Sequence, residues 1–365
     1  MSALTFAYSD LVDRAAALLE HAGVPAAAAR LTADGLVEAD ARGLPSHGLM
    51  LLPMYLDRIR AGSVDPTGAN TAVVDLGAAA IFDSNNGLGQ VTAQHAMESA
   101  IARAAAHGVG LVACRNAFHF GGAYRYTALA AEAGMVSIAA ANTRPLMPAP
   151  GGARAVVGNN PIAFGAPRAA GDPIIFDAAL SEAALGKIRL AASAGRAIPT
   201  GWATDADGQP TTDAERAIAG MLLPSGGNKG FGFALFVDLL TGVLAGGGFG
   251  SRVTGLYADP ATPYGSAQFF LAIDATRLSP DFPERAETLA REILDAPRAA
   301  GAGEGRIPGA RGAAARRAAE RIGVALPASV VEAIRTLEAA ANQPAAPPAA
   351  PPANPPVNHK EGEAK

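Results

Sequence analysis

Cysteine, aromatic residues and long uncharged apolar runs are all scarce in this chain. Cys114 is the single cysteine, so no disulfide can form within the chain, and this usage fits a reducing compartment. The N-terminal segment has no basic stretch followed by an apolar core, which argues against a signal peptide. No apolar run reaches the ~18 uncharged residues that a membrane span needs. We therefore expect a cytoplasmic protein that makes no contact with a membrane.

Basic surfaces and metal-ligand patterns are also missing. The formal net charge is −4, from 29 lysines and arginines against 33 acidic residues, and the charges are evenly spread. This balance argues against a face that binds nucleic acid or anionic lipid. The six histidines show no metal-ligand spacing, so no metal site is expected, and the absence of a GxSxG motif disfavours a serine hydrolase.

Apolar periodicity predicts helices at both ends of the chain and a strand-rich middle. In the middle of the chain, β-type runs alternate with helical stretches, which predicts an α/β fold. The expected helices are 9–22, 25–42, 49–61, 90–108, 122–132, 182–194, 283–296, 312–322 and 328–341, and the expected strands are 71–76, 79–83, 109–114, 135–141, 161–167, 173–177 and 266–273.

These elements predict a discontinuous helical lobe around an α/β lobe. Residues 1–70 and 280–341 are expected to form the helical lobe, and residues 71–279 the α/β lobe. The proline- and alanine-rich tail, 342–365, is expected to be disordered because it has too little apolar area to bury. The apolar stretch 231–246 is interrupted by an aspartate and by glycines, so we expect a buried helix there and no membrane span.

A glycine-rich turn at Gly87-x-Gly89-x-x-Thr92 follows an expected strand and precedes an expected helix. This is close to a dinucleotide-binding fingerprint. However, Thr92 would hinder close packing of helix and strand, and the next strand ends in Arg115 where an acidic residue is usual. We therefore favour an ordinary tight turn at these glycines.

Histidines in two turns are candidates for proton transfer. His47 follows Ser46 where a helix is expected to begin, and the positive end of a helix favours neutral imidazole and attracts anions. The alternative is that Ser46 caps the helix and His47 is an incidental surface residue. His119 lies in the turn before 122–132; either it takes part in acid–base chemistry, or Phe118 and Phe120 anchor the core while His119 points to solvent.

Polar turns occur at three further places. Asn142–Pro145 and Gly158–Pro161 flank expected strands, where short amides either orient a ligand or form ordinary turns. Pro224–Gly230 leads into the apolar helix and contains Lys229, one of only two lysines before the tail. A compact ammonium at a helix start suits a phosphate or ribose group, although a solvated loop lysine is the plain alternative.

Taken in order, these segments resemble the type-2 malate/L-lactate dehydrogenase family. That family also includes ureidoglycolate and sulfolactate dehydrogenases, diketogulonate reductases and Δ1-piperideine-2-carboxylate reductases. The resemblance spans residues 5–340 and rests on the ordered motifs EADARGLPSHG, DSNNGLGQVTAQHAME, NAFHFGGAYRYTALAAEAGM, NTRPLMPAPGG, VGNNPIAF, FDAALSEAALGK, IPTGWATDADGQPTTD and PSGGNKGFGFALFVDLLTGVLAG.

The resemblance implies a non-Rossmann mixed sheet that carries NAD or NADP, a helical lobe built from both chain ends, and a homodimer. It implies that His47 is the proton donor with Ser46 beside it, and that His119 is a catalytic base or a cofactor contact. Asn159 would meet the substrate. The remaining residues that it implies for the cofactor are Phe120, Gly121, Gly122, Thr143, Asp177, Ala178, Ala179, Lys229 and Gly230.

Three positions depart from the family pattern. Leu51 stands where many members carry an arginine that can clamp the substrate carboxylate, so Arg42 and Arg144 are the substitute candidates. Lys187 stands where the imine reductases carry an acidic residue, which favours a keto-acid substrate. Pro308-Gly309-Ala310 replaces a proline-glycine-glutamate motif associated with cofactor contacts.

The expected activity is therefore NAD(P)-dependent interconversion of a small 2-oxo acid and its 2-hydroxy acid, of the malate or lactate type. Two alternatives stay open. One is reduction of a cyclic imine such as Δ1-piperideine-2-carboxylate or Δ1-pyrroline-2-carboxylate. The other is a catalytically silent homologue that binds a small acid, since membership of a fold does not by itself prove activity.

Overall fold

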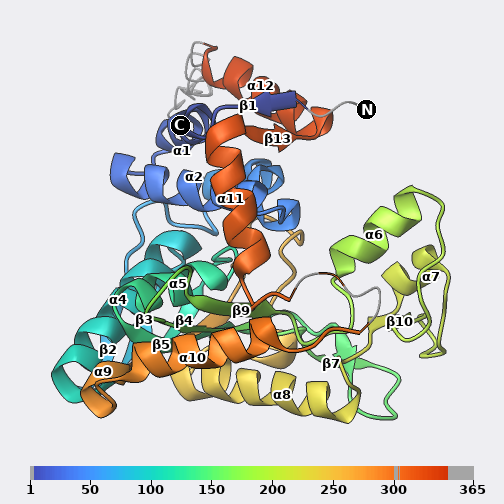
Figure 1. Cartoon of the computed structure of the whole chain (residues 1–365). Helices are drawn as coiled ribbons and strands as arrows, with labels where there is room; N and C mark the ends of the chain where they lie inside the picture. Colours follow the sequence, from blue (N-terminus) through green and yellow to red (C-terminus); the bar gives the residue numbers. More distant parts are fainter. Residues whose placement is uncertain (1–3, 300–302, 304, 344–365) are drawn as a thin grey trace, which may run out of the picture.

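A computed structural model describes residues 4–299, 303 and 305–343, arranged as a helical lobe above a central sheet with further helices below (Figure 1). The elements expected from periodicity are present within a few residues of their predicted bounds. Most of the predicted disordered tail, from residue 344 on, lies outside the described residues. Within the described part, no helix is long and apolar enough to cross a membrane.

A seven-stranded mixed sheet in the order β2-β3-β4-β12-β5-β8-β9 forms the centre of the molecule. β3 and β4 run parallel and are connected by helix α4 (Gly89–His107). The other neighbouring strands of this sheet are antiparallel. The strands are β2 (Thr71–Asp75), β3 (Ala79–Asp83), β4 (Val109–Ala117), β5 (Met135–Ala141), β8 (Ile162–Ala166), β9 (Ile174–Ala178) and β12 (Ser266–Asp274).

The glycines before α4 serve close backbone packing. A Cβ added to Gly87 would overlap the backbone of Gly68, and a Cβ added to Gly89 would overlap the carbonyl oxygen of His119. Because these contacts already occupy the space beside the turn, the structure agrees with the tight-turn interpretation. The same contact brings the start of α4 against the turn that carries His119.

Both ends of the chain contribute to the helical lobe above the sheet (Figure 1). Its largest apolar cluster includes Leu19, Leu36 and Leu52 from the N-terminal helices and Val331 and Ile334 from the C-terminal one. The first and last parts also pair as strands. The elements are β1 (Leu4–Phe6), α1 (Tyr8–His21), α2 (Ala26–Ala41), α3 (Leu52–Arg60), α11 (Ala310–Ile322), β13 (Val324–Leu326) and α12 (Ala328–Ala341).

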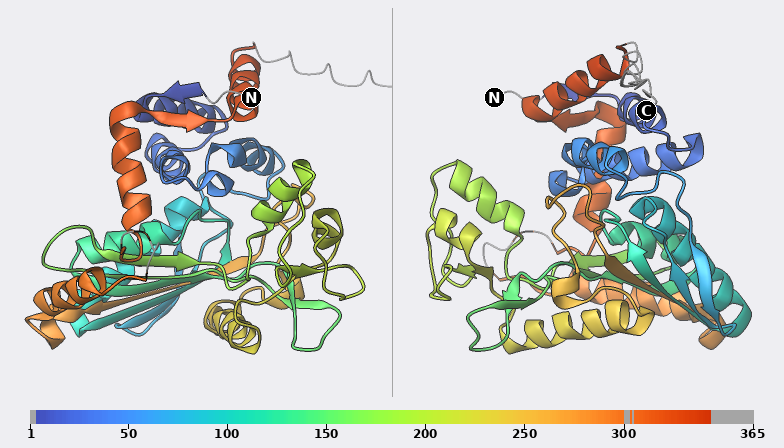
Figure 2. Two further views of the ribbon diagram at one scale, coloured as in Figure 1. Left: turned by 45° about the vertical axis from the view of Figure 1, so that its right-hand side comes forward. Right: turned by 180° about the vertical axis from the view of Figure 1, so that it is seen from behind.

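Helix α10 (Phe282–Asp295) differs from the expected division of the chain. It lies below the sheet, on the side opposite the helical lobe (Figures 1 and 2). Arg168 beside β8 pairs with Glu287 on this helix. The predicted range 280–341 for the C-terminal part of the helical lobe therefore does not hold for α10, because apolar periodicity shows that a helix has a buried face but not what covers it.

Helix α8 (Asn228–Asp238) and the π-helical turn after it (Leu239–Val243) also lie below the sheet. The expectation of a buried helix over 231–246 was wrong. Only part of its surface packs on the sheet, and its large outward side chains are 45–59% exposed; these are Phe233, Leu235, Phe236, Leu239, Val243 and Leu244. This exposed apolar face, residues 233–244, is called the α8 face below.

A small arm that the sequence did not reveal extends to one side of the sheet (Figure 2). It has its own apolar cluster around Ile188, Ile198 and Leu222. Its elements are α6 (Leu185–Ser193), β10 (Ala203–Thr204), α7 (Ala214–Ala219) and β11 (Met221–Leu222), and the neighbouring ribbon is β6 (Met147–Pro148) with β7 (Ala155–Val157).

A buried carboxylate joins the helical lobe to the sheet lobe. Glu38 on α2 is 3% exposed and accepts from arginines on three helices. Its oxygens lie 2.8 Å from Arg42 at the C-terminal end of the same helix, 2.6 Å from Arg125 on α5 (Tyr124–Glu132) and 3.1 Å from Arg316 on α11. This cluster holds α2, α5 and α11 in fixed relation.

Candidate active site

His47 ends a short 3₁₀ turn, Pro45–His47, that comes directly before the helical segment beginning at Leu49. Its Nδ1 lies 3.0 Å from the Ser46 hydroxyl. The side chain is half-buried, and burial lowers the pKa of His47 below its usual value. The imidazole is therefore neutral near pH 7, and loss of solvation is the cause.

His119 follows β4 and is held by two side chains from different elements. Its Nδ1 lies 2.7 Å from the hydroxyl of Tyr55 on α3. Gln90 on α4 donates to the same hydroxyl over 3.0 Å. Tyr55 and Gln90 are both at most 1% exposed, so this network has little freedom to move. Because Nδ1 is occupied, Nε2 is the nitrogen of His119 that is free to meet a ligand.

The two histidine rings face each other across the boundary between the lobes. Their centroids are 5.7 Å apart and the ring planes differ by 27°. Burial, followed by the nearby His47, lowers the pKa of His119 to about 3. Two neutral imidazoles so placed can donate to or accept from one small ligand between or beside them.

The structure supports one part of the plain interpretation of the turn around His119. Phe118 and Phe120 are core anchors, as one alternative held: Phe118 packs edge-on against Tyr55 with centroids 5.0 Å apart, and Phe120 stacks on Tyr126. His119 does not simply point to solvent, however, since it contacts Tyr55 and His47. Phe120 is only 3% exposed and its carbonyl accepts from the Tyr126 hydroxyl, so the structure gives it a core role.

Asp177 at the end of β9 has a structural contact that the sequence did not suggest. Its Oδ2 accepts from the backbone N–H of Tyr124 over 2.9 Å, and so caps the start of α5. The protein itself thus satisfies the helix start after Gly121 and Gly122. A cofactor phosphate is better accommodated elsewhere.

The start of α8 offers such a place. The N–H of Ser225 donates to the Leu180 carbonyl over 2.9 Å, which brings the loop before α8 beside the end of β9 at Ala178 and Ala179. Lys229 is exposed in the first turn, and a Cβ added to Gly230 would overlap the Ser225 backbone. A helix start with a free ammonium suits the phosphates of a nicotinamide dinucleotide.

Thr143 and Asn159 lie next to each other, as a shared site requires. The Thr143 hydroxyl donates to Oδ1 of Asn159 over 2.9 Å, and both side chains are half-buried. The neighbouring amides are structural: Asn160 donates to the Ala234 carbonyl, and Asn142 donates to Asp238. The turn interpretation therefore holds for Asn142 and Asn160, while Asn159 keeps part of its surface accessible.

Three residues bear on how a substrate carboxylate could be bound. Leu51 is 1% exposed in the core, so an apolar contact replaces any clamp there. Arg42 is engaged with Glu38, and its guanidinium lies 4.4 Å from the centre of the Tyr124 ring. Arg144 is exposed, and no carboxylate pairs with it within the described part of the chain.

The arm approaches the site from the other side. A Cβ added to Gly186 on α6 would lie 3.8 Å from the Cβ of Ser46, so the first turn of α6 lies beside the His47 turn. Lys187 follows it and is exposed. At the far end of the chain, Gly309 has a φ of +88° and approaches Ile175 of β9 closely, which explains the glycine in the Pro308–Ala310 segment.

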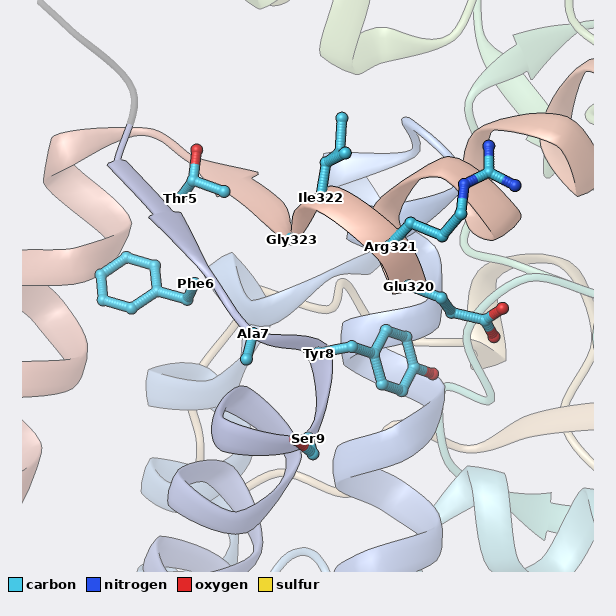
Figure 3. Close-up of a pocket in the computed structure, with 9 residues that line it drawn as sticks. All are labelled: Thr5, Phe6, Ala7, Tyr8, Ser9, Glu320, Arg321, Ile322 and Gly323. Atoms are coloured by element: carbon cyan, nitrogen blue, oxygen red, sulfur yellow. The ribbon is translucent and has the colours of Figure 1, made fainter.

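A groove of about 510 Å³ lies between β1 and the end of α11 (Figure 3). Its lining includes Phe6, Tyr8, Glu320 and Ile322. Tyr8 donates to Asp34 and so is already satisfied. The lining contains no histidine, and the histidine pair is the better candidate.

Sequence reasoning missed Tyr55, Gln90 and Asp40. Each lies within a helix expected from periodicity, where a polar residue is ordinary. Their hydrogen-bond partners are His119 for Tyr55, Tyr55 for Gln90 and Leu49 for Asp40, and they lie 9–64 residues away in the chain. Only the polarity of Gln90 at a helical position facing the core could have given a signal.

Comparison with known proteins places these residues in context. The family model described as malate/L-lactate dehydrogenase matches residues 6–335. The chain is 38% identical over 322 residues to (2R)-3-sulfolactate dehydrogenase (NADP(+)) of Chromohalobacter salexigens, covering 88% of this chain and 94% of that protein. It is 35% identical to a Δ1-pyrroline-2-carboxylate/Δ1-piperideine-2-carboxylate reductase of Pseudomonas syringae pv. tomato, covering 84% and 88% of the two chains.

A solved structure shows the same fold. The dehydrogenase from Sinorhizobium meliloti superimposes with a TM-score of 0.86 at 35% identity, covering 92% of this chain and 98% of that chain. The mixed α/β fold with its seven-stranded sheet is thus shared with solved proteins of the same kind.

The buried state of His119 predicts a pH-dependent stability. Its folded pKa of about 3 lies below the unfolded value of ~6.5, so the unfolded chain binds the extra proton between these pH values. Stability therefore falls as the pH falls through this window, by at most ~1.4 kcal/mol per pH unit for one proton. In His119→Gln, urea unfolding from pH 7 to 4 should show a shallower loss than in the wild type.

The control is His21→Gln, which changes a histidine that is exposed on α1. Its stability curve should run parallel to that of the wild type, because an exposed ring stays in water in both states. Parallel curves for His119→Gln and the wild type would contradict the burial of a neutral His119.

Proposed function

The chain belongs to the malate/L-lactate dehydrogenase family, and from that premise we propose that it interconverts a small 2-oxo acid and its 2-hydroxy acid. The observation that carries this proposal is the pair of neutral, half-buried histidines 5.7 Å apart, His47 and His119. A nicotinamide dinucleotide, NAD or NADP, supplies or accepts the hydride when bound.

His47 is the proton donor and acceptor in this proposal. Its lowered pKa makes the neutral ring the resting form, which can accept the hydroxyl proton of a 2-hydroxy acid. In the reverse direction the same ring carries the proton to the alkoxide oxygen. Ser46, 3.0 Å from Nδ1, orients the ring so that Nε2 faces the ligand.

His119 holds the ligand and stays neutral throughout. Tyr55 occupies its Nδ1, and burial prevents protonation near neutral pH. It can therefore give or receive a hydrogen bond at Nε2 without competing for the transferred proton. This division of roles follows from the contacts of the two rings: Tyr55 on a neighbouring helix holds Nδ1 of His119, whereas Nδ1 of His47 meets only the adjacent Ser46.

The residues at the end of β9 and the start of α8 fit the cofactor. The exposed Lys229 and the helix start suit its phosphates, while Gly121 and Gly122, which follow His119 in the chain, and Thr143 are further cofactor candidates. The relative from Chromohalobacter salexigens is named for NADP(+), which supports testing NADPH first and NADH beside it.

Arg144 is the better candidate for binding the substrate carboxylate. Its side chain lies near Gly255, where an added Cβ would be 3.2 Å from the Arg144 Cδ, and its charge acts on Tyr264. The Tyr264 ring packs edge-on against Phe118, next to His119. Arg42 is less suited because Glu38 already holds it.

Cyclic-imine reduction is the second candidate, favoured by the similarity to the reductase of Pseudomonas syringae. The same histidine pair could protonate the imine nitrogen, and hydride transfer to the carbon would then give the neutral amine. Lys187 follows Gly186, which lies beside Ser46, and favours the keto acid, because a cation there disfavours a protonated imine nitrogen.

A homodimer accounts for the α8 face. Six large apolar side chains exposed on one continuous helical surface exceed what a monomer usually leaves in water. Packing of this face against the same face of a second copy would bury them with two-fold symmetry. Lys229 lies in the first turn of this interface helix, so the dimer would also support the cofactor residues.

Replacement of His47 tests the proposed chemistry. His47→Ala should lower kcat by about 10²–10⁴-fold, because general acid–base catalysis is lost. Oxidation of NADH and NADPH is followed with pyruvate, oxaloacetate, sulfopyruvate and Δ1-piperideine-2-carboxylate, and cofactor fluorescence confirms that the variant still binds nucleotide. Wild-type turnover in His47→Ala would overturn the assignment, and faster turnover of the imine than of every oxo acid would favour the second candidate.

Replacement of Arg144 tests substrate binding. Arg144→Gln should raise the KM for the oxo acid by about 10–100-fold, as expected for losing a hydrogen bond to a charged group. The matched variant Arg42→Gln should lower the stability and leave that KM within a few fold. If Arg42→Gln raises KM and Arg144→Gln does not, the two roles are exchanged.

Light scattering tests the dimer. The wild type should have twice the chain mass of 36.6 kDa, and Phe236→Asp on the α8 face should shift it toward a single chain. The control Ile322→Asp, at an exposed site on the helical lobe, should leave the mass unchanged. A wild type with the mass of one chain would rule out the proposed dimer.

A further inference from the structure

A carboxylate lies directly against the turn that presents His47. Asp40 is in the last turn of α2, and its Oδ2 accepts from the backbone N–H of Leu49 over 2.7 Å. Leu49 is the first residue of the helical segment that continues into α3 and carries Tyr55. One carboxylate therefore contacts the chain between His47 and the residue that holds His119.

Gly48, between His47 and Leu49, is matched to this carboxylate. Its φ of −96° and ψ of −158° are extended values that any residue can adopt, so the backbone alone does not require glycine. A Cβ added to Gly48 would overlap the carboxyl carbon and both oxygens of Asp40. A side chain at position 48 would therefore have to displace the Asp40 carboxylate from the place in which it accepts from Leu49.

Asp40 differs from the other acidic residues of α2. Asp34 and Glu38 each pair with arginine, whereas no arginine or lysine pairs with Asp40 within the described part of the chain. Burial raises the pKa of Asp40 to about 7, so keeping this carboxylate charged in the folded chain costs free energy. Its acceptance of the first N–H of a helical segment offsets part of that cost.

We propose that Asp40 is a positioning residue for the proton transfer. Its carboxylate sets the backbone of Gly48 and Leu49, and thereby fixes both the ring of His47 and the start of the segment from which Tyr55 holds His119. The proposal rests on the proposed function in that His47 is taken as the acid–base group. Asp40 itself touches neither substrate nor cofactor.

A double-mutant cycle between Asp40 and Gly48 tests this role. Gly48→Ala should lower kcat by about 100-fold with KM changed by less than about threefold, because small misplacement of a catalytic group is costly. Asp40→Ala should lower kcat by about 10-fold or more. In Asp40→Ala the space is free, so adding Gly48→Ala should cost less than about threefold further.

Two further variants separate positioning from general damage. Asp40→Asn keeps a hydrogen-bond acceptor of the same shape, so its kcat should stay within about threefold of the wild type. Asp40→Ala loses the acceptor, so its kcat should stay low. Asp13→Ala, an exposed aspartate on α1, should leave kcat unchanged. Equal losses from Gly48→Ala in both backgrounds, or wild-type kcat in Asp40→Ala, would overturn the proposal.

Two readouts do not depend on activity. The melting temperature should fall in Gly48→Ala alone and not when Gly48→Ala is added to Asp40→Ala. The NMR signal of the His47 ring is assigned by its loss in His47→Ala. It should shift when Gly48→Ala is made in the wild type. The same substitution made in Asp40→Ala should shift it much less. If no oxo acid or imine is turned over, the proposed function fails, while these measurements still decide whether Asp40 positions His47.

Discussion

The structure depends on a buried carboxylate that binds three arginines. Glu38 joins its own helix to α5 beside the sheet and to α11 from the other end of the chain. Removing one partner of such a buried cluster costs ~3–5 kcal/mol, since the remaining charges are left uncompensated. Because the helical lobe carries His47 and the sheet lobe carries His119, the site exists only while these lobes keep their relation. The ionic cluster is thus a structural requirement for a site that it does not itself contact.

Confinement then gives the two histidines their properties. Neither has a carboxylate partner among the described residues; burial is the main cause of both lowered pKa values. Glycine makes this confinement possible at two points, where Gly89 lets α4 approach the His119 carbonyl and Gly48 leaves room for the Asp40 carboxylate. These glycines, which a motif search takes for a phosphate-binding signature or a helix signal, act here through close backbone packing. The neutral state of the two histidines thus depends more on close packing than on neighbouring charges.

The α8 face shows where sequence reasoning reached its limit. An apolar run with a helical period predicts a buried face, and the helix is present as expected. The local sequence does not specify what covers that face. In the single chain, Phe233 and Phe236 on this face are exposed to water. The same limit applies to α10, whose helix was predicted but whose place below the sheet was not. Local pattern fixes the element, and only distant contacts fix its neighbours.

The sequence by itself determined the order and type of the helices and strands, the membership of the family, and the candidates His47 and His119, because these depend on residue spacing over short stretches. Tertiary structure alone decided which candidates meet. It brought His47 to His119, bound Arg42 to Glu38 while leaving Arg144 exposed, and placed Tyr55, Gln90 and Asp40 behind the site. The physical reason is that such contacts join positions up to hundreds of residues apart. The histidine pair that was a pattern in the sequence is therefore a site only in the folded chain.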